Sequence, residues 1–530
     1  MASSSPSLRP LLLFAAVALA VSGTAGGATL GLDFHHRFSD RVRQWAEAHG
    51  GLPGGWWPKK GSVEYYAALA RHDRALRGRA LADGGDPDKD LVFADGNVTF
   101  RHSSLGFLHY AIVALGTPNV TFLVALDTGS DLFWVPCNCI SCAPTSSRYY
   151  GLRTNFEFNI YSPTKSSTSR KVPCNSSFCE LKSSCSAATG SCPYVVQYVS
   201  YNTSSTGVLV EDILYFKTEE TIPKVVKAPI VFGCGQIQTG AFLDGAAPNG
   251  LFGLGLDNVS VPSVLASKGY TSDSFSMCFG SDGIGRIYFG DKGSSDQEET
   301  PFDVNHGHPT YNISFTGLEV RNSSVDVKFS AIVDSGTSFT YLADPEYTKL
   351  TESFDTQVQE NRLKSDPDIP FEYCYELSPN QGSIIPPKII LTTKGGSQFP
   401  INDPIVVLSN QQRLFAYCLA IIKSHRLNII GQNFMTGLRI VFDRERLILG
   451  WKEFDCYDAE GSSTLPVNRN QSAIPPSPAS GPSSYTPDTT KERGNNTQAT
   501  VLPPPSSHSS HLNSMESIFW TLIVFSLAIL

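Results

Sequence analysis

The chain has 530 residues, more than one ordinary hydrophobic core accommodates, so two domain-sized units with additional segments are expected. Hydrophobic residues make up 41% and aromatic residues 11% of the composition, which excludes a largely disordered protein. The formal net charge of −8 argues against nucleic acid as the main partner, because binding to phosphate groups needs a basic surface.

The N-terminal residues have the pattern of a secretory signal peptide. Arg9 precedes the apolar run Leu11–Val21, and small residues follow through Ala25. A basic start, a short apolar run and a small-residue cleavage site are the three parts of such a peptide. The sequence therefore predicts a signal peptide over residues 1–25.

Residues 26–95 contain no cysteine, and we predict that they form a pro-segment. Within them, Val63–Leu81 carries apolar residues at helical spacing. Six Lys or Arg residues stand between Lys59 and Arg79, against two acidic residues. A basic helix in an acidic protein suits a pro-segment docked over an acidic cleft. A surface helix with a solvated charged face is the alternative.

From residue 105 to about Trp451 the chain consists of short β-branched and aromatic runs broken by Gly, Pro and Ser. This pattern predicts an all-β fold with few helices. The clearest predicted strands are Ala111–Leu115, Phe122–Leu126, Ala228–Phe232, Arg286–Phe289 and Asn428–Ile430.

An internal repeat divides this region into two halves. In the first half an apolar strand ends in Asp-Thr-Gly-Ser at 127–130, and in the second half a similar strand ends in Asp-Ser-Gly-Thr at 334–337. A later element also recurs, as Asn249–Gly255 and Asn428–Gln432. Two β-lobes with matching elements would place their Asp loops face to face across a cleft. We assign an N-terminal lobe to residues 96–300 and a C-terminal lobe to residues 301–458.

Two facing carboxylates cannot both ionise easily, so they share one proton and titrate as a pair. In the singly protonated pair, one carboxylate takes a proton from a bound water while the other protonates a substrate carbonyl oxygen. We therefore predict that Asp127 and Asp334 are catalytic. The alternative is a pair of strand-end turns with capping hydroxyl groups, which the recurrence in both halves disfavours.

The residues beside the two aspartates suit this chemistry. Glycine permits a tight turn with close backbone approach, and hydroxyl groups can donate to the carboxylates or bond between the loops. The predicted supporting residues are Thr128, Gly129, Ser130, Ser335, Gly336 and Thr337. The reaction requires neither a metal nor a cofactor, and the chain lacks the His-Glu-x-x-His and Gly-x-Ser-x-Gly motifs. No metal and no cofactor are predicted.

Cysteines and glycosylation motifs indicate an oxidising, secretory environment. We predict disulfides among Cys137, Cys139, Cys142, Cys174, Cys179, Cys185, Cys192, Cys234, Cys278, Cys374, Cys418 and Cys456. A metal knuckle at the first three of these is the weaker alternative, because no matching Cys/His pair follows at zinc spacing. Asn-x-Ser/Thr motifs predict N-glycosylation at Asn97, Asn119, Asn175, Asn202, Asn258, Asn312, Asn322, Asn470 and Asn495.

The C-terminal part has two segments of unusual composition. Residues 459–510 contain 9 Pro, 11 Ser and 6 Thr, which cannot bury a core and predict a solvated stalk. In residues 511–530, a polar spacer precedes the uncharged apolar run Ile518–Leu530. Small residues, a spacer and an apolar tail form the pattern of a glycosylphosphatidylinositol (GPI) attachment signal. A tail anchor or a merely adhesive end is the alternative.

The motifs together resemble the pepsin-type (A1) aspartic endopeptidases over roughly residues 105–455, and most closely the atypical, GPI-anchored plant enzymes related to nepenthesins. The resemblance rests on Asp127–Pro136, Phe232–Gly235, Asp334–Ser338, Asn428–Gly431, Val441–Asp443 and Leu449–Trp451, and on the cysteine-rich insert Cys137–Cys192. It implies a bilobal β fold with the active-site cleft between the lobes, and extended peptide or protein substrates. It also implies a disulfide between Cys374 and Cys418.

The family has a flap, a hairpin over the cleft whose tyrosine hydrogen-bonds the tryptophan that follows the first Asp loop. Trp134 stands seven residues after Asp127, as the family pattern requires, and Tyr198 is the predicted flap tyrosine. The chain reads Tyr-Val-Ser-Tyr-Asn there, where the family usually has Tyr-Gly-Asp-Gly. Tyr201 and, less well, Tyr194 therefore remain alternatives.

These observations predict a secreted, monomeric aspartic endopeptidase held on the extracellular face of the plasma membrane by a GPI anchor. A catalytically inactive binding or inhibitor protein on the same fold is the alternative. Plant relatives of that kind resemble the family but have altered catalytic loops, whereas both loops are intact here. A structural wall glycoprotein would account for the stalk but not for the two Asp loops.

Overall fold

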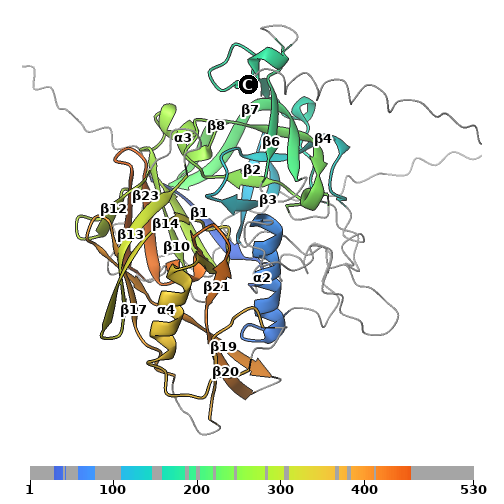
Figure 1. Cartoon of the computed structure of the whole chain (residues 1–530). Coiled ribbons are helices and arrows are strands. Elements are labelled where there is room, and N and C mark those ends of the chain that lie inside the picture. The colour runs from blue at the N-terminus through green and yellow to red at the C-terminus, as the bar shows by residue number, and fades with distance from the viewer. Residues whose placement is uncertain are drawn as a thin grey trace, which may run out of the picture. The chain divides into compact units, whose positions relative to one another are not determined.

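Short strands joined by turns make up most of the computed structural model (Figure 1). The structure describes residues 29–39, 42, 58–77, 109–145, 158–185, 190–198, 203–218, 223–243, 247–280, 284–303, 310–364, 369–378, 384–410 and 413–454. The predicted signal peptide, stalk and anchor signal lie outside these residues. No helix in the described ranges combines the length and the apolar character that crossing a bilayer requires.

A 14-stranded sheet contains the strands of the first half and two strands from the end of the second. Its order is β12-β24-β23-β10-β11-β1-β2-β3-β9-β4-β8-β7-β5, and β6 pairs with β7. Its strands are β1 (Leu30–His36), β2 (His109–Leu115), β3 (Val120–Asp127), β4 (Trp134–Ser141), β5 (Arg170–Lys171), β6 (Pro193–Gln197), β7 (Ser204–Thr218), β8 (Val225–Thr239), β9 (Leu251–Gly253), β10 (Ser274–Phe279), β11 (Ile284–Phe289), β12 (Glu298–Pro301), β23 (Leu438–Asp443) and β24 (Ile448–Glu453).

The remaining strands of the second half form two further sheets, ordered β18-β17-β13-β14-β22-β15-β21 and β16-β20-β19. They are β13 (Asn312–Val320), β14 (Ser323–Val333), β15 (Thr340–Ala343), β16 (Cys374–Glu376), β17 (Ile389–Thr393), β18 (Gln398–Ile401), β19 (Ile405–Asn410), β20 (Arg413–Leu419), β21 (Ile421–Ser424) and β22 (Ile429–Ile430). The α-helices with described bounds are α2 (Val63–Arg77), α3 (Val261–Ser267), α4 (Glu346–Asp355) and α5 (Gln432–Met435).

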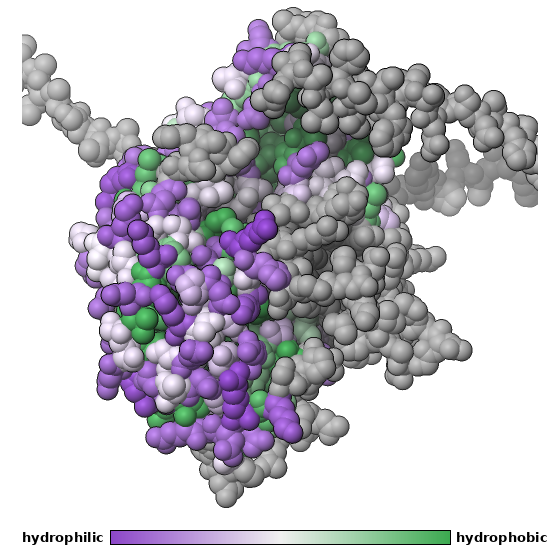
Figure 2. Space-filling model, viewed as in Figure 1, coloured by the Kyte–Doolittle hydropathy of each residue, from purple (hydrophilic) through white to green (hydrophobic). Residues whose placement is uncertain are grey.

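The strands show the alternating burial of a sheet that has one face on the core. Along β7, buried residues alternate with partly exposed ones over most of its length, as a strand with one face on the core requires. A single apolar cluster then runs from Leu214 and Phe275 of the first half to Phe315 and Phe442 of the second. On the outside, hydrophilic residues cover most of the surface over β13, β17 and α4 (Figure 2). The prediction of an all-β fold with few helices is confirmed.

Two elements come from the predicted pro-segment. β1 lies between β11 and β2 in the large sheet, pairing Leu32 with Ile287 and Phe34 with Ala111. α2 begins at the predicted residue, and its described part ends at Arg77, four residues before the predicted end. In the form that the structure describes, this segment is therefore part of the folded unit.

The structure forms disulfides among the described cysteines, as predicted. The pairs are Cys137–Cys234, Cys139–Cys142, Cys174–Cys185, Cys179–Cys192 and Cys374–Cys418, the last being the pair that the resemblance implies. Cys278 is also disulfide-bonded, and Cys456 lies outside the described residues. The metal-knuckle interpretation is wrong, because its three sulfur atoms are all consumed in disulfides.

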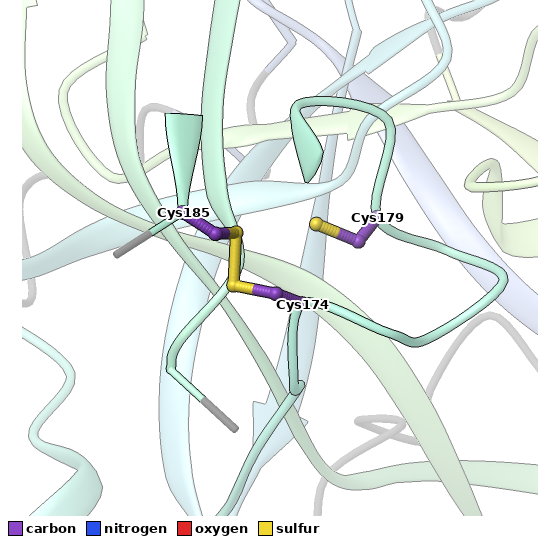
Figure 3. A group of neighbouring side chains, drawn as sticks. All are labelled: Cys174, Cys179 and Cys185. Carbon is purple, nitrogen blue, oxygen red and sulfur yellow. A yellow bond between two sulfur atoms is a disulfide. The ribbon is translucent and has the colours of Figure 1, made fainter. Parts of the chain in front are cut away.

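The insert brings three sulfur atoms close together. Those of Cys174, Cys179 and Cys185 lie within 4.8 Å of one another. Figure 3 shows the bond between Cys174 and Cys185, and Cys179 is bonded to Cys192. Because a disulfide sulfur is not a thiolate ligand, these cysteines cross-link the insert and do not form a metal site.

The glycosylation motifs differ in exposure. Asn119, Asn175, Asn258 and Asn322 are exposed, as a glycan acceptor must be. Asn312 is half-buried at the start of β13 and its Oδ1 is buried, which disfavours a glycan there. Asn97, Asn202, Asn470 and Asn495 lie outside the described residues. Glycosylation of the exposed sites stays a prediction.

Candidate active site

The two aspartates stand at equivalent places in the two halves. Asp127 ends β3, which pairs in parallel with β9, and Asp334 directly follows β14, which pairs in parallel with β22. The strands β9 and β22 belong to the recurring second element. The symmetry extends to the loops, since Gly255 N donates to Ser130 O at 2.8 Å and Gln432 N to Thr337 O at 2.8 Å. The sequence repeat is therefore a structural repeat.

Each carboxylate is held by its own loop. Oδ1 of Asp127 accepts from Gly129 N at 2.9 Å, and its Oδ2 accepts from the Ser130 hydroxyl at 2.7 Å. In the second loop, Oδ1 of Asp334 accepts from Gly336 N at 3.0 Å, and its Oδ2 accepts from the Thr337 hydroxyl. Four of the six predicted supporting residues thus fix the orientation of the carboxylates.

The two carboxylates converge on one point. A Cβ added to Gly336 would lie 3.1 Å from Oδ1 of Asp127 and 3.3 Å from Oδ1 of Asp334. Any side chain at this position would therefore crowd both oxygens. Asp127 is 6% exposed and Asp334 is fully buried, so both carboxylates are shielded from bulk water. Two carboxylates this close to one point can act together on a single bound molecule, one as an acid and one as a base.

The other two supporting residues join the loops to each other. Thr128 Oγ1 accepts a hydrogen bond from Ser335 N at 3.0 Å, and the two hydroxyl oxygens lie 3.3 Å apart. Both residues are buried. This cross-link ties the loop of one half to the loop of the other, directly beside the carboxylates.

Tyr198 is the tyrosine that meets Trp134. The indole Nε1 of Trp134 donates to the Tyr198 hydroxyl at 3.0 Å, from strand β4 to the hairpin of β6 and β7. Phe242, which sequence reasoning missed, packs edge-on against both rings, with centroids 5.0 and 4.8 Å away. Tyr194 instead bonds Ser205, with 2.9 Å between the hydroxyl oxygens. Tyr201 lies outside the described residues.

A third acidic residue beside the first loop was not predicted. Asp131 Oδ1 accepts from Asp257 N at 2.8 Å. Burial raises the pKa of Asp131 to about 6, and the charges of Asp257 and Asp127 add to this, while the Asp257 N–H and Arg444 oppose it. The sequence signal was an acidic residue four positions after Asp127, directly before the apolar run Leu132–Val135. Asp131 holds the loop Leu254–Asp257 against the first Asp loop.

Helix α2 attaches to the segment that follows the second aspartate. Its residue Asp73 is fully buried, and its carboxylate accepts from Ser338 N at 2.7 Å and Phe339 N at 3.1 Å. Burial raises the pKa of Asp73 to about 7, against the lowering effect of these N–H donors. The apolar face of α2, including Tyr66 and Leu69, joins Phe339 and its neighbours in one cluster.

The family comparison follows the same two halves. The family model described as "Xylanase inhibitor N-terminal" matches residues 109–291, and the model described as "Xylanase inhibitor C-terminal" matches residues 310–453. The chain is 20–21% identical to the crystal structures of lupine conglutin gamma and soybean basic 7S globulin, with TM-scores of 0.50 and 0.51. Each covers 66% of this chain and 92% of the solved one, a likeness that shows the fold alone.

Full-length relatives are proteases by name. "Aspartyl protease family protein 1" of Arabidopsis thaliana is 49% identical over 523 residues, covering 98% of this chain and 97% of the relative. "Aspartic proteinase-like protein 1" of the same plant is 40% identical over 434 residues, 80% of each chain. Nepenthesin-2 of Nepenthes gracilis is 26% identical over 65% of this chain and 77% of its own. The chain belongs to the pepsin-like (A1) family of plant aspartic proteases.

Proposed function

We propose that the protein is an aspartic endopeptidase in which Asp127 and Asp334 activate a water molecule to hydrolyse peptide bonds. One observation carries the proposal: both carboxylates converge on Gly336, each held by a backbone N–H and a hydroxyl of its own loop. The hydroxyl groups bond to the outer Oδ2 atoms and the backbone N–H groups to the inner Oδ1 atoms. In the proposed site, the inner pair also shares the catalytic proton and the water.

In the proposed reaction, the charged carboxylate takes a proton from the water, whose oxygen attacks the substrate carbonyl carbon. The protonated carboxylate gives its proton to the carbonyl oxygen, so a neutral tetrahedral diol forms. The newly protonated carboxylate then gives its proton to the amide nitrogen, while the other carboxylate takes a proton from one hydroxyl of the diol. The C–N bond breaks, the carboxylic acid and amine products form, and the pair returns to its starting state. Positioned acid–base groups of this kind contribute roughly 10²- to 10⁴-fold in rate.

The family models are described as xylanase inhibitor domains, so an inactive binding protein is the second candidate. The intact loops favour the enzyme. A peptide in which a hydroxyl-bearing carbon replaces the scissile carbonyl imitates the tetrahedral intermediate and separates the two functions. If the protein is an enzyme, it cleaves an unfolded protein substrate, and this peptide inhibits the cleavage. A binding protein leaves the substrate intact at every pH.

The Trp134–Tyr198 hydrogen bond should orient the flap. Tyr198→Phe removes the acceptor at 3.0 Å and is expected to lower kcat/KM by about tenfold, the effect of one buried hydrogen bond. Tyr194→Phe, which removes a hydroxyl bond of 2.9 Å in the same hairpin, should retain the wild-type value. Equal losses in the two variants would contradict a special role for Tyr198.

We propose further that residues 26–95 act as a pro-segment, with α2 as its docking element. The buried contact of Asp73 with Ser338 and Phe339 supports this, because it engages the chain directly after the second catalytic loop. The segment would hold the region next to Asp334 until it is cut.

We propose that the mature protein is a monomer on the extracellular face of the plasma membrane, held by a GPI anchor for which the tail 511–530 is the attachment signal. The composition of this tail supports the proposal. Phosphatidylinositol-specific phospholipase C should then release the protein from intact cells. A protein that stays bound, with Ile518–Leu530 still present in the mature chain, would rule the anchor out.

A further inference from the structure

One loop supports the first catalytic motif by its backbone. Within Leu254–Asp257, Leu254 N donates to the carbonyl oxygen of Asp127 at 3.0 Å, and Gly255 N donates to that of Ser130 at 2.8 Å. The carbonyl oxygen of Leu254 accepts in turn from the Tyr311 hydroxyl at 2.6 Å. Tyr311 comes from the second half of the chain, directly before β13. The support of Asp127 thus reaches across to the other half.

The backbone of Tyr311 contacts the strand of the second aspartate. Its carbonyl oxygen accepts from Val333 N at 2.8 Å, and Val333 directly precedes Asp334. Tyr311 therefore forms hydrogen bonds on both sides. Its main chain bonds to the strand that precedes Asp334, and its side chain bonds to the loop that supports Asp127. Three hydrogen bonds, of 2.8, 2.6 and 3.0 Å, complete the connection.

The side chain of Tyr311 cannot move freely. It is 1% exposed, and its ring contacts those of Phe442 and Phe302 at centroid distances of 4.6 and 5.3 Å. The charges that act on its hydroxyl are those of Arg444, Asp131 and Asp273. Burial raises the pKa of Tyr311 above its ordinary value, so the hydroxyl remains a donor throughout the acidic and neutral range.

We propose that Tyr311 is a positioning residue that fixes the separation of Asp127 and Asp334. The role rests on the proposed peptidase function and adds a second bridge to the direct Thr128–Ser335 contact. Because two coupled carboxylates titrate according to their distance, a residue that sets this distance also sets the pH range of catalysis. A displacement of about 1 Å at a reacting group can cost roughly 100-fold in rate.

Tyr311→Phe tests this by deleting a single hydroxyl group. We expect kcat to fall by about tenfold, the effect of one buried hydrogen bond. KM should stay near the wild-type value, because Tyr311 touches loop backbone inside the protein. The two limbs of the pH–rate profile should move closer together, because aspartates that drift apart repel each other less. Active-site titration with the hydroxyl-bearing peptide counts folded sites, so unfolded molecules do not lower the measured kcat.

Tyr375→Phe is the matched control. Tyr375 is also 1% exposed, and its hydroxyl donates to Asp355 at 2.8 Å. It lies on β16, which belongs to a different sheet from β13. The Tyr375→Phe variant should lose stability but keep the wild-type kcat and pH–rate profile.

The possible results are distinct. If Tyr311→Phe matches Tyr375→Phe in kcat and in profile, Tyr311 has only a structural role and the inference is overturned. If the wild-type protein shows no cleavage that depends on Asp127, the proposed function fails, and the inference fails with it.

Discussion

Replacing either Asp127 or Asp334 by asparagine should lower the rate of peptide cleavage by roughly 10⁴-fold, because each carboxylate is both an acid and a base in the cycle. The amide of asparagine cannot take up or release the catalytic proton. It keeps an oxygen for the N–H donor of its loop, Gly129 or Gly336, so the loop geometry should survive. The measurement is the initial rate per folded molecule on an unfolded protein substrate.

Asp326→Asn, an exposed carboxylate on β14, is the control for the change of residue type. The two active-site variants should melt at or above the wild-type temperature, since one of two crowded buried carboxyl groups is replaced by a neutral amide. Wild-type cleavage in Asp127→Asn or Asp334→Asn would mean that the hydrolysis is carried out elsewhere in the molecule.

Asp73 should make the docking of α2 depend on pH. Burial raises its pKa from 3.8 to about 7, so the folded protein holds a proton on Asp73 more tightly than the unfolded chain does. The stability contributed by the neutral group is therefore full below about pH 4 and is lost as the pH rises toward 7, by about 4 kcal/mol in all. Acidification alone should thus strengthen the attachment of α2, and its release would require cleavage of the chain.

The melting temperature of the uncleaved protein at about pH 4.5 and pH 8 measures this effect. Asp73→Asn has no titrating group at this position, so the difference between the two temperatures should shrink by several degrees relative to the wild type. Asp326→Asn should retain the wild-type difference. If the difference between the two melting temperatures in Asp73→Asn equals that of the wild type, Asp73 does not titrate on docking.

The fold class and the two Asp loops could be predicted because their signals are local. Short β-branched and aromatic runs broken by Gly, Pro and Ser mark the strands, and each Asp loop stands at the end of an apolar run, so the repeat is visible in the sequence alone. The position of β1 could not be predicted. Its partners Ile284–Phe289 are about 250 residues away, and a strand carries no mark of which distant edge it joins.

The residues that join distant parts of the chain were missed for the same reason. Asp73 meets Ser338 across 265 positions, and only burial on all sides distinguishes it from an ordinary helix-surface carboxylate. Tyr311 lies in a segment without a recognisable motif. Its proposed role depends partly on its backbone carbonyl group, which no side-chain motif reveals. The choice among three flap tyrosines likewise needed the Trp134 hydrogen bond.

The pH–rate profile for cleavage of an unfolded protein, measured on the mature protein beside Asp127→Asn and Asp334→Asn, tests the two-aspartate mechanism most directly. The mechanism predicts an acid-optimal, bell-shaped profile, because the pair must hold one proton, and its loss in both variants. A folded wild-type protein that cleaves nothing between about pH 3 and 7, with residues 26–95 removed, would contradict it and favour a binding protein on a protease fold.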